Sequence, residues 1–317
     1  MTAARKGAAE NAEAVKHEAR TVRNTLGFEV ARAFYTVLKA RAFVRAAEAA
    51  VVSYENNVSI AQKRFEVGTI LKSDVLAVEV RLAQAREDLV KAKNGVTLAL
   101  KALRTLLGID DEDFDVADEI PAVEVPAGLD FSGRPELATI AHKKRAAEAA
   151  VKAARSGYLP KIGVFASVDY DHGWRFNGDG ASWTAGAGLE WNIWDGKATR
   201  ARVSEAKANL EIVEEHERKL RLGLGLELEQ ALLGLKEANE RLAVTSTVVS
   251  QAEESAQLTR ARFEEGLALA TQLIDAETAL TAARVRRAEA EADRNIAIAS
   301  LRRALGVAQL DNPDLSP

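Results

Sequence analysis

Arg64-Phe65-Glu66-Val67-Gly68 and Arg262-Phe263-Glu264-Glu265-Gly266 are two versions of one pentapeptide, 198 residues apart in a chain of 317 residues. The same offset relates Leu107-Gly108 to Leu305-Gly306, and 15 of the 45 positions from 64 to 108 are identical to their partners without a gap. Self-similarity at a fixed period is the signature of a duplicated structural unit. Gly68, Gly108 and their partners suit the left-handed residue that ends a helix. The repeat therefore predicts one helical hairpin used twice.

Long helices are predicted on both sides of residue 135. No proline occurs in residues 1–120 or 161–312, so uninterrupted helices are permitted there. An a/d heptad seam runs through Val75, Leu82, Leu89, Val96 and Leu103 with Val78, Ala85, Ala92, Ala99 and Leu106. Small residues at one seam position favour close antiparallel packing of slender helices. The second repeat keeps the alanines, but Arg287 and Arg294 replace two apolar residues, and the sequence leaves open whether they face solvent, a lumen or another subunit.

Composition excludes several classes of site. The chain has no cysteine, which rules out zinc-thiolate sites and disulfides. Its formal charge of −4 gives no sign of a nucleic-acid partner, and only 5% of its residues are aromatic. The four histidines, which lack metal-ligand spacing, are His17, His142, His172 and His216. The sequence contains no phosphate-loop motif and no G-x-S-x-G motif. His172 beside Asp169 and Asp171 suits either a metal ligand or an ordinary solvated loop. We predict no catalytic residues, no metal and no cofactor.

A different pattern occupies residues 161–194, beside all four tryptophans. Apolar residues alternate with polar residues or glycine from Lys161 to Asp171 and again from Ser182 to Trp194. Ile162, Val164, Ala166, Val168 and Tyr170 share one predicted face with Trp183, Ala185, Ala187, Leu189, Trp191 and Ile193. Two such strands of about ten residues are typical of a membrane barrel hairpin, and a soluble hairpin capping a coiled coil is the alternative. One hairpin cannot close in lipid, so the membrane interpretation predicts an oligomer.

Taken together, these motifs resemble the TolC-like outer-membrane efflux factors. The matching features, in order, are Ala33-Phe34-Tyr35, Arg64–Gly68 before Asp74-Val75-Leu76, Leu106-Leu107-Gly108, Arg134-Pro135-Glu136-Leu137, Tyr158-Leu159-Pro160, and Trp194-Asp195-Gly196 before Arg200. The resemblance implies a mainly α fold of long antiparallel helical hairpins in two repeats, with one β-hairpin contributing to a trimeric transmembrane β-barrel. It implies a passive duct in the cell outer membrane and periplasm, serving a tripartite efflux or type I secretion system. The implied partners are two further copies, a periplasmic adaptor, an inner-membrane pump or ABC transporter, and outer-membrane lipid.

The resemblance also divides the chain. We expect residues 1–108 to form the first helical hairpin, an incomplete first repeat, and residues 109–133 to form an acidic, proline-containing equatorial connector. Residues 134–160 are expected to form a helix that leads to the barrel, a short helix after Arg134, and residues 161–195 to form the β-hairpin. Residues 196–306 are expected to form the second helical hairpin and residues 307–317 a tail.

Candidate gating and pore-constriction residues follow from the same resemblance. Asp74, six residues after Gly68, matches a gating aspartate, and Asp275 matches the second of two ring aspartates. Gln272 stands where the first ring aspartate would be, Phe263 where a tyrosine would bond the gating aspartate, and Ala268 in place of a basic partner. An acidic ring in a pore selects cations. The alternative interpretation of Asp74 is an ordinary charge at a helix N-terminus, and that of Asp275 is a solvated helix face. Gly68 and Gly266 mark the helix turns, and Trp183, Trp191 and Trp194 are candidate membrane-interface aromatics.

Two rival interpretations accompany this one. The first is a soluble coiled-coil structural or adaptor protein. The second is a truncated family member that no longer assembles, because the first repeat has only 108 residues where the second has 198. On that comparison, about 90 residues with a first β-hairpin and a secretion signal are expected before residue 1.

Overall fold

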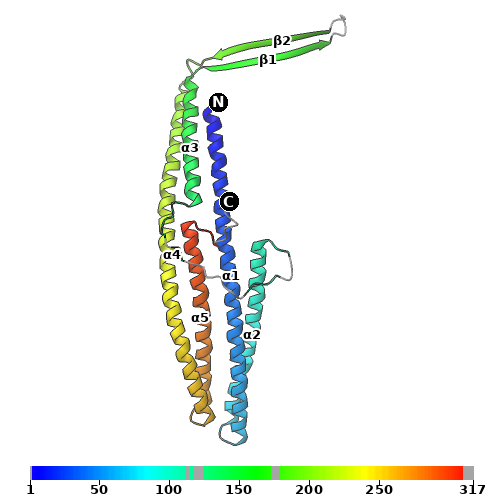
Figure 1. Cartoon of the computed structure of the whole chain (residues 1–317), viewed down its shortest axis with the longest axis vertical. Coiled ribbons are helices and arrows are strands. Elements are labelled where there is room, and N and C mark those ends of the chain that lie inside the picture. The colour runs from blue at the N-terminus through cyan, green and yellow to red at the C-terminus, as the bar shows by residue number, and fades with distance from the viewer. Residues whose placement is uncertain (1, 111–113, 118–124, 127, 173–178, 310–317) are drawn as a thin grey trace. The chain divides into compact units, whose positions relative to one another are not determined.

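The fold consists of long helices and one β-hairpin (Figure 1). The computed structural model describes residues 2–110, 114–117, 125, 126, 128–172 and 179–309. Its helices are α1 (Thr2–Glu66), α2 (Lys72–Leu107), α3 (Pro135–Arg155), α4 (Ala198–Glu264) and α5 (Ala270–Leu305), with a short 3₁₀ turn at Ser156–Tyr158. The strands are β1 (Lys161–His172) and β2 (Asp179–Glu190). The chain divides into one unit of residues 1–19 and 135–222 and a second unit of residues 20–134 and 223–317.

The second unit holds two helical hairpins, α1–α2 and α4–α5, whose turns lie at the same end (Figure 1). Both turns have positive φ at their glycine, 75° at Gly68 and 86° at Gly266, and both second helices end at a left-handed glycine. Equivalent ion pairs join the two helices of each hairpin. Arg86 bonds Glu55 at 2.8 Å, and Arg284 bonds Glu253 at 2.9 Å. The repeat in the sequence is therefore a repeat in structure.

Burial along α2 follows the predicted seam only in part. Val75, Val78, Ala85 and Leu103 are buried, but Leu82, Leu89 and Ala92 are half-buried and Leu106 is exposed. On α5 the alanine seam is better covered, since Ala283, Ala290 and Ala304 are all buried. The largest cluster of buried side chains lies at the turn end and joins both hairpins around Tyr54, Val78, Phe263 and Leu273. Hairpin packing at the turns is thus tighter than the heptad pattern alone predicts.

The two arginines that interrupt the second seam have different surroundings. Arg294 donates from Nε to Asn239 Oδ1 on α4 at 2.8 Å, so it closes the α4–α5 hairpin. Arg287 is exposed. In the connector, Arg41 of α1 donates to the Val116 carbonyl at 2.6 Å and pairs with Asp115.

The first unit packs α3 between charged neighbours. Lys143 pairs with Glu18 of α1 at 2.5 Å, and Lys144 pairs with Glu214 of α4 at 3.3 Å. Gly7 lies close to α3, because a Cβ there would be 3.7 Å from Ala146 O. The helix after Arg134 has 21 residues and is shorter than α1, α2, α4 and α5. Within the described residues, no helix has the length and apolar character needed to cross a bilayer.

Candidate functional site

The turn end of the second unit brings most candidate gating residues together. A cavity of about 510 Å³ lies between the two turns, lined from one side by Arg64, Gly68 and Asp74 and from the other by Gly266 and Gln272. Ala268 also lines it. Because each turn ends one helix and starts another, it leaves backbone carbonyl and N–H groups that need partners outside the regular helix.

Asp74 and Gln272 occupy equivalent positions and make equivalent bonds. Asp74 Oδ2 accepts from the backbone N–H of Leu71 at 3.1 Å, and Gln272 Oε1 accepts from the N–H of Leu269 at 3.0 Å. Each side chain is the third residue of its helix and satisfies a backbone donor that the helix leaves free. Asp74 is half-buried and Gln272 is exposed. Both residues therefore start a helix, whatever further role they have in a pore.

Phe263 is completely buried in the cluster at the turn end. The guanidinium of Arg64 lies over its ring, 4.8 Å from the centroid, and Arg64 Nη1 donates to the Phe263 carbonyl at 2.6 Å. Arg64 Nε also reaches Thr69 Oγ1 at 3.4 Å. A cation over an aromatic face and a charge-assisted bond to a helix-terminal carbonyl both stabilise this contact. Arg64 joins the first turn to the second, a role that the sequence indicated only through the repeated Arg-Phe pair.

Asp275 lies one turn into α5 and is exposed. Within the described part of the chain, its side chain makes no hydrogen bond or ion pair. A free carboxylate on an exposed helix face is available to face solvent or a lumen.

A buried polar network around Glu277, two residues beyond Asp275, was not predicted. Glu277 is 2% exposed; its carboxylate accepts from Ser53 Oγ at 2.8 Å and Asn57 Nδ2 at 3.3 Å on α1 and pairs with Arg260 on α4. Arg260 also donates to Ser53 Oγ at 2.8 Å. Buried charge is tolerated when it is paired and hydrogen-bonded in this way. The repeated Glu79 and Glu277 were the available signal, although Glu79 accepts a bond from Gln62, at 3.3 Å, in a more exposed setting.

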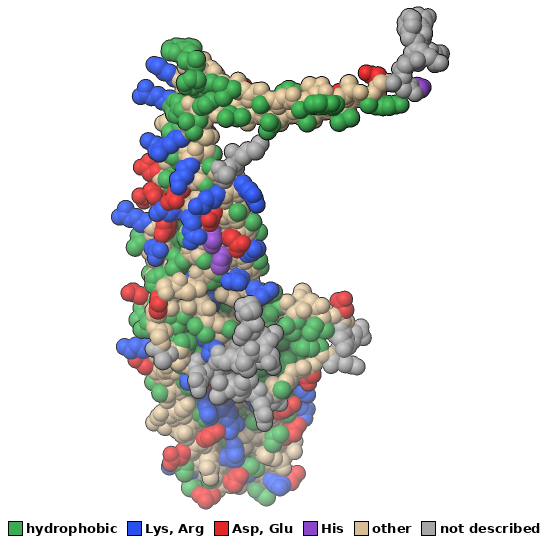
Figure 2. All heavy atoms as spheres, turned by 45° about the horizontal axis from the view of Figure 1, so that its top comes forward, with side chains coloured by type: hydrophobic (Ala, Val, Ile, Leu, Met, Phe, Trp, Pro, Cys, Tyr) green, Lys and Arg blue, Asp and Glu red, His purple; other side chains and the backbone are tan. Residues whose placement is uncertain are grey.

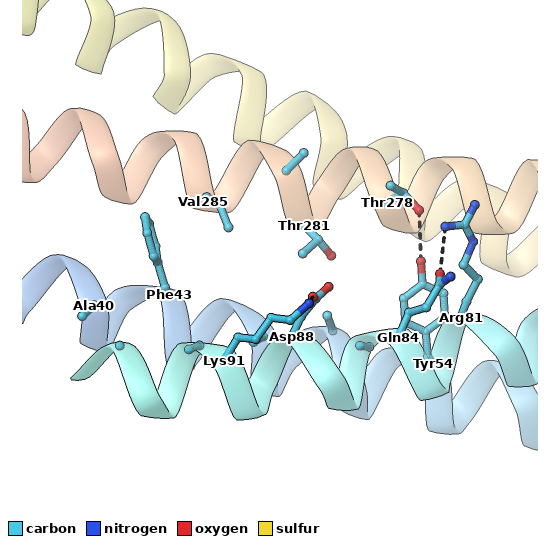
Figure 3. A pocket seen from close by; sticks show the side chains of 16 residues that line it. Ala40, Phe43, Tyr54, Arg81, Gln84, Asp88, Lys91, Thr278, Thr281 and Val285 are labelled. Atoms are coloured by element: carbon cyan, nitrogen blue, oxygen red, sulfur yellow. Dashed lines mark hydrogen bonds and ion pairs between the residues drawn. The ribbon is translucent and has the colours of Figure 1, made fainter. Parts of the chain in front are cut away.

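Next to this network, Tyr54 of α1 bonds Thr278 of α5 through their hydroxyl groups at 3.1 Å (Figure 3). Burial raises the pKa of Tyr54 above its usual value, and nearby Glu277 acts in the same direction. The pair lies at one end of a groove of about 540 Å³, lined by α1, α2 and α5 and including Phe43, Ala85 and Val285. Alanines form much of this lining, so the two hairpins leave an apolar hollow between them.

The β-hairpin presents two unlike faces. Cross-strand pairing sets Ile162 opposite Leu189, Val164 opposite Ala187 and Val168 opposite Trp183, on one face. Val164 and Val168 are 85% and 80% exposed, and Figure 2 shows hydrophobic side chains in a row along the hairpin. The predicted apolar face is confirmed, and in the single chain nothing among the described residues covers it.

The opposite face carries small and polar residues. Gly163 faces Gly188, Ser167 faces Thr184, and Phe165 faces Gly186. A Cβ at position 186 would lie 2.6 Å from the Phe165 ring, so a side chain there would require this ring to shift.

The tryptophans do not all lie where the pattern placed them. Trp183 is in β2, but Trp191 and Trp194 follow the end of β2 at Glu190, so the prediction of a strand to Trp194 was wrong. Trp191 leaves the ladder and donates from its indole nitrogen to the Tyr158 carbonyl at 3.4 Å. The sequence also predicts a loop rich in turn-forming residues from His172 to Gly180, between the two strands, and most of it, residues 173–178, lies outside the described residues.

Two of the four histidine side chains are in contact. His17 of α1 stacks on His142 of α3 with ring centroids 5.4 Å apart, and His142 Nδ1 lies 2.8 Å from Glu10 Oε2. No spacing in the sequence suggested this pair, because the two helices come from distant segments. Throughout the described ranges, no group of three histidine, aspartate or glutamate side chains is arranged to hold a metal ion.

Comparison with known proteins gives consistent matches. Residues 1–109 and 131–307 match the outer membrane efflux protein family. The cation efflux system protein CusC of Escherichia coli K12 is 24% identical over 312 residues, covering 94% of this chain and 67% of CusC. Outer membrane protein OprJ of Pseudomonas aeruginosa is 26% identical over 310 residues, covering 92% of this chain and 64% of OprJ.

A solved membrane-protein structure has a similar fold. A crystal structure of a membrane protein from Pseudomonas aeruginosa superposes with a TM-score of 0.87 at 23% identity, covering 97% of this chain and 71% of the other. The repeated hairpins, the exposed apolar strand face and a match that spans most of the chain agree: this chain belongs to the outer membrane efflux protein family.

Proposed function

We propose that the chain is the outer-membrane component of an efflux or type I secretion system and forms, with two further copies, a passive duct across the outer membrane and periplasm. The observation that carries this proposal is the β-hairpin with one wholly exposed apolar face. Strands whose outward residues are apolar and whose inward residues are small or polar are those of a lipid-embedded barrel. Because every backbone group in lipid must be paired, β1 and β2 supply part of a wall completed by other strands.

Aromatic residues support the placement of this hairpin in a bilayer. Trp183 and Trp191 are eight positions apart, roughly 27 Å along an extended chain, and both are more than half exposed. The apolar band of outer-membrane barrels is about 25 Å tall and is flanked by aromatic girdles. We assign Trp183 to one interface and Trp191 with Trp194 to the other.

The helical hairpins form the periplasmic part of the duct in this proposal. The turn end exposes apolar side chains at Leu71, Leu267 and Leu269, each about 70% exposed. Exposed apolar residues gathered at one end are typical of a protein contact. We assign this end to a periplasmic adaptor that links the duct to an inner-membrane pump or ABC transporter, which supplies the energy. No catalytic step is part of this function.

Reconstitution tests the duct directly. The purified full chain is expected to require detergent, to run as a trimer by light scattering and to conduct ions after insertion into a planar bilayer. A detergent-free soluble monomer or dimer would instead support a structural or adaptor coiled-coil protein. Assembly without conductance would contradict the duct.

Cation selectivity tests the assignment of Asp275 to a pore constriction. In the proposed duct, three copies place three exposed carboxylates around the lumen, and such a ring favours cations by its field. Asp275→Asn is expected to reduce the cation-to-anion permeability ratio. Gln272→Asp is the matched gain variant, because Asp74 shows that aspartate at this position still starts the helix, and it is expected to raise the ratio. An unchanged ratio in Asp275→Asn would remove Asp275 from the constriction.

A further inference from the structure

One aromatic side chain interrupts the small and polar face of the β-hairpin. Phe165 lies in the middle of β1, and among the described strand residues it is the one large apolar side chain on this face. Residues that face the lumen of a membrane barrel are normally polar. Phe165 therefore needs an explanation that an apolar band in lipid does not supply.

The Phe165 ring lies across the strand pair, on the backbone of Gly186. The two residues are directly opposite each other. A Cβ added to Gly186 would lie 2.6 Å from the ring Cζ and 2.9 Å from Cε1. Gly186 is half-buried, whereas the other residues of β1 and β2 whose side chains are described are exposed. The outer half of the ring thus covers this glycine.

The neighbouring glycines on the same face do not seat the ring. Gly163 and Gly188 form the next pair on this face, on the side of the helices. Among the described residues, nothing lies within 4 Å of a Cβ added at either position. An aromatic ring that covers a glycine stabilises paired strands, because it packs on backbone that would otherwise be bare. Of these three glycines, Phe165 is seated on Gly186 alone.

The orientation of the ring decides how far it extends from the sheet. A ring that lies flat adds about one ring thickness, roughly 3.5 Å, to the wall. Side chains of a strand otherwise stand roughly perpendicular to the sheet in staggered rotamers. A methyl group at position 186 would take the place of the ring tip, so Phe165 would have to turn away from the sheet.

We infer that Gly186 holds Phe165 flat against the inner wall of the barrel and that this pair, repeated in each copy, sets the free width of the lumen at this level. Phe165 is then a pore-lining residue that limits the size of the solute, and Gly186 is its positioning residue. The inference rests on the proposed duct, because it requires this face to line a water-filled lumen. It adds a size-determining position in the barrel, apart from the charged constriction assigned to Asp275.

Graded thiol labelling tests the inference, because the chain has no cysteine of its own. On this face, Ser182→Cys lies on the loop side of Phe165 and Lys161→Cys on the helix side. In intact cells, maleimide-linked polyethylene glycols enter the proposed lumen from outside, so they pass the level of Phe165 only on the way to position 161. Gly186→Ala is expected to slow labelling of Lys161→Cys by the largest polymer that labels the parent, by ~10-fold or more, because pore diameter excludes the polymer.

Two controls fix the meaning of that result. Labelling of Ser182→Cys by the same polymer, and labelling of both cysteines by the small reagent N-ethylmaleimide, are expected to be unchanged by Gly186→Ala. Gly188→Ala adds the same methyl group on the same face where space is open, and it is expected to behave like the parent. Unchanged polymer labelling in Gly186→Ala, or equal slowing in Gly188→Ala, would overturn the inference.

Removal of the ring tests the same pair from the other side. Phe165→Ala combined with Gly186→Ala is expected to restore labelling of Lys161→Cys, and slow labelling that persists would overturn the inference, since the ring would not be the obstacle. Phe165→Ala alone decides the matter if Gly186→Ala does not assemble. It is expected to admit a larger polymer to position 161 than the parent admits, and an unchanged size limit would overturn the inference.

The Ser182→Cys reporter separates this inference from the duct itself. If polymers label Ser182→Cys from outside but the ring variants leave labelling of Lys161→Cys unchanged, the lumen stands and the role of Phe165 and Gly186 falls. If no polymer labels Ser182→Cys in any background, the duct is overturned together with the inference.

Discussion

Arg260→Ala is expected to lower the free energy of unfolding by about 2 kcal/mol, because it leaves the buried carboxylate of Glu277 without its cation. Removing one member of a fully buried ion pair costs ~3–5 kcal/mol. The expected cost is smaller here because the Arg260 side chain is 34% exposed and Ser53 and Asn57 still donate to Glu277. Urea unfolding of the detergent-purified chain, followed by circular dichroism, measures the change.

The repeat provides the control for this experiment. Gln62 is the counterpart of Arg260 and bonds Glu79, the counterpart of Glu277. Because that pair is more exposed, Gln62→Ala is expected to change stability by no more than ~0.5 kcal/mol. Equal losses in the two variants would show that the Glu277 network is not held by its buried ion pair.

Ala166→Arg is expected to prevent stable insertion of the chain in the outer membrane. Ala166 lies near the middle of β1, opposite Ala185 on the apolar face. An arginine on the lipid face at mid-bilayer costs ~2–4 kcal/mol, and a trimer bears this cost three times. Membrane fractionation and the yield of detergent-extracted trimer measure the loss.

Ser167→Arg is the matched control, one residue away on the opposite face. Ser167 pairs with Thr184 on the small and polar side of the hairpin, which faces water in the proposed duct. This variant is expected to insert like the parent and to change only ion permeation. If both arginines were tolerated equally, the apolar face would not be in contact with lipid.

The local structure of this chain could be read from its sequence. Proline-free segments, left-handed glycines and a period-two pattern determine helices, turns and strands through short-range sterics and through which face is apolar. The limits of the strand pattern show where such reasoning ends. Trp191, Ile193 and Trp194 continue the alternation, yet β2 stops at Glu190. Its last pairing partner is Lys161, and the residue before Lys161, Pro160, has no N–H with which to continue the ladder.

Much of the candidate site needed the structure. Asp74 and Gln272 lie 198 residues apart at equivalent positions of the repeat, and their equivalent helix-starting bonds follow from local geometry. Arg64 was visible only as part of a repeated motif, because its bond to Phe263 joins residues from different hairpins. The stacking of His17 on His142 likewise depends on which helices pack side by side.

By itself, the sequence determined that one helical hairpin occurs twice and that one β-hairpin has an apolar face. The tertiary structure decided which residues of each helical hairpin are buried. Phe65 and Phe263 share a motif, but one is 43% exposed and the other fully buried, and Glu79 and Glu277 differ in the same way. Identical residues adopt the same local conformation, but their burial depends on the neighbouring helix. At these positions the second hairpin also has a helix of the other hairpin packed against it, because α1 contacts both Glu277 and Phe263.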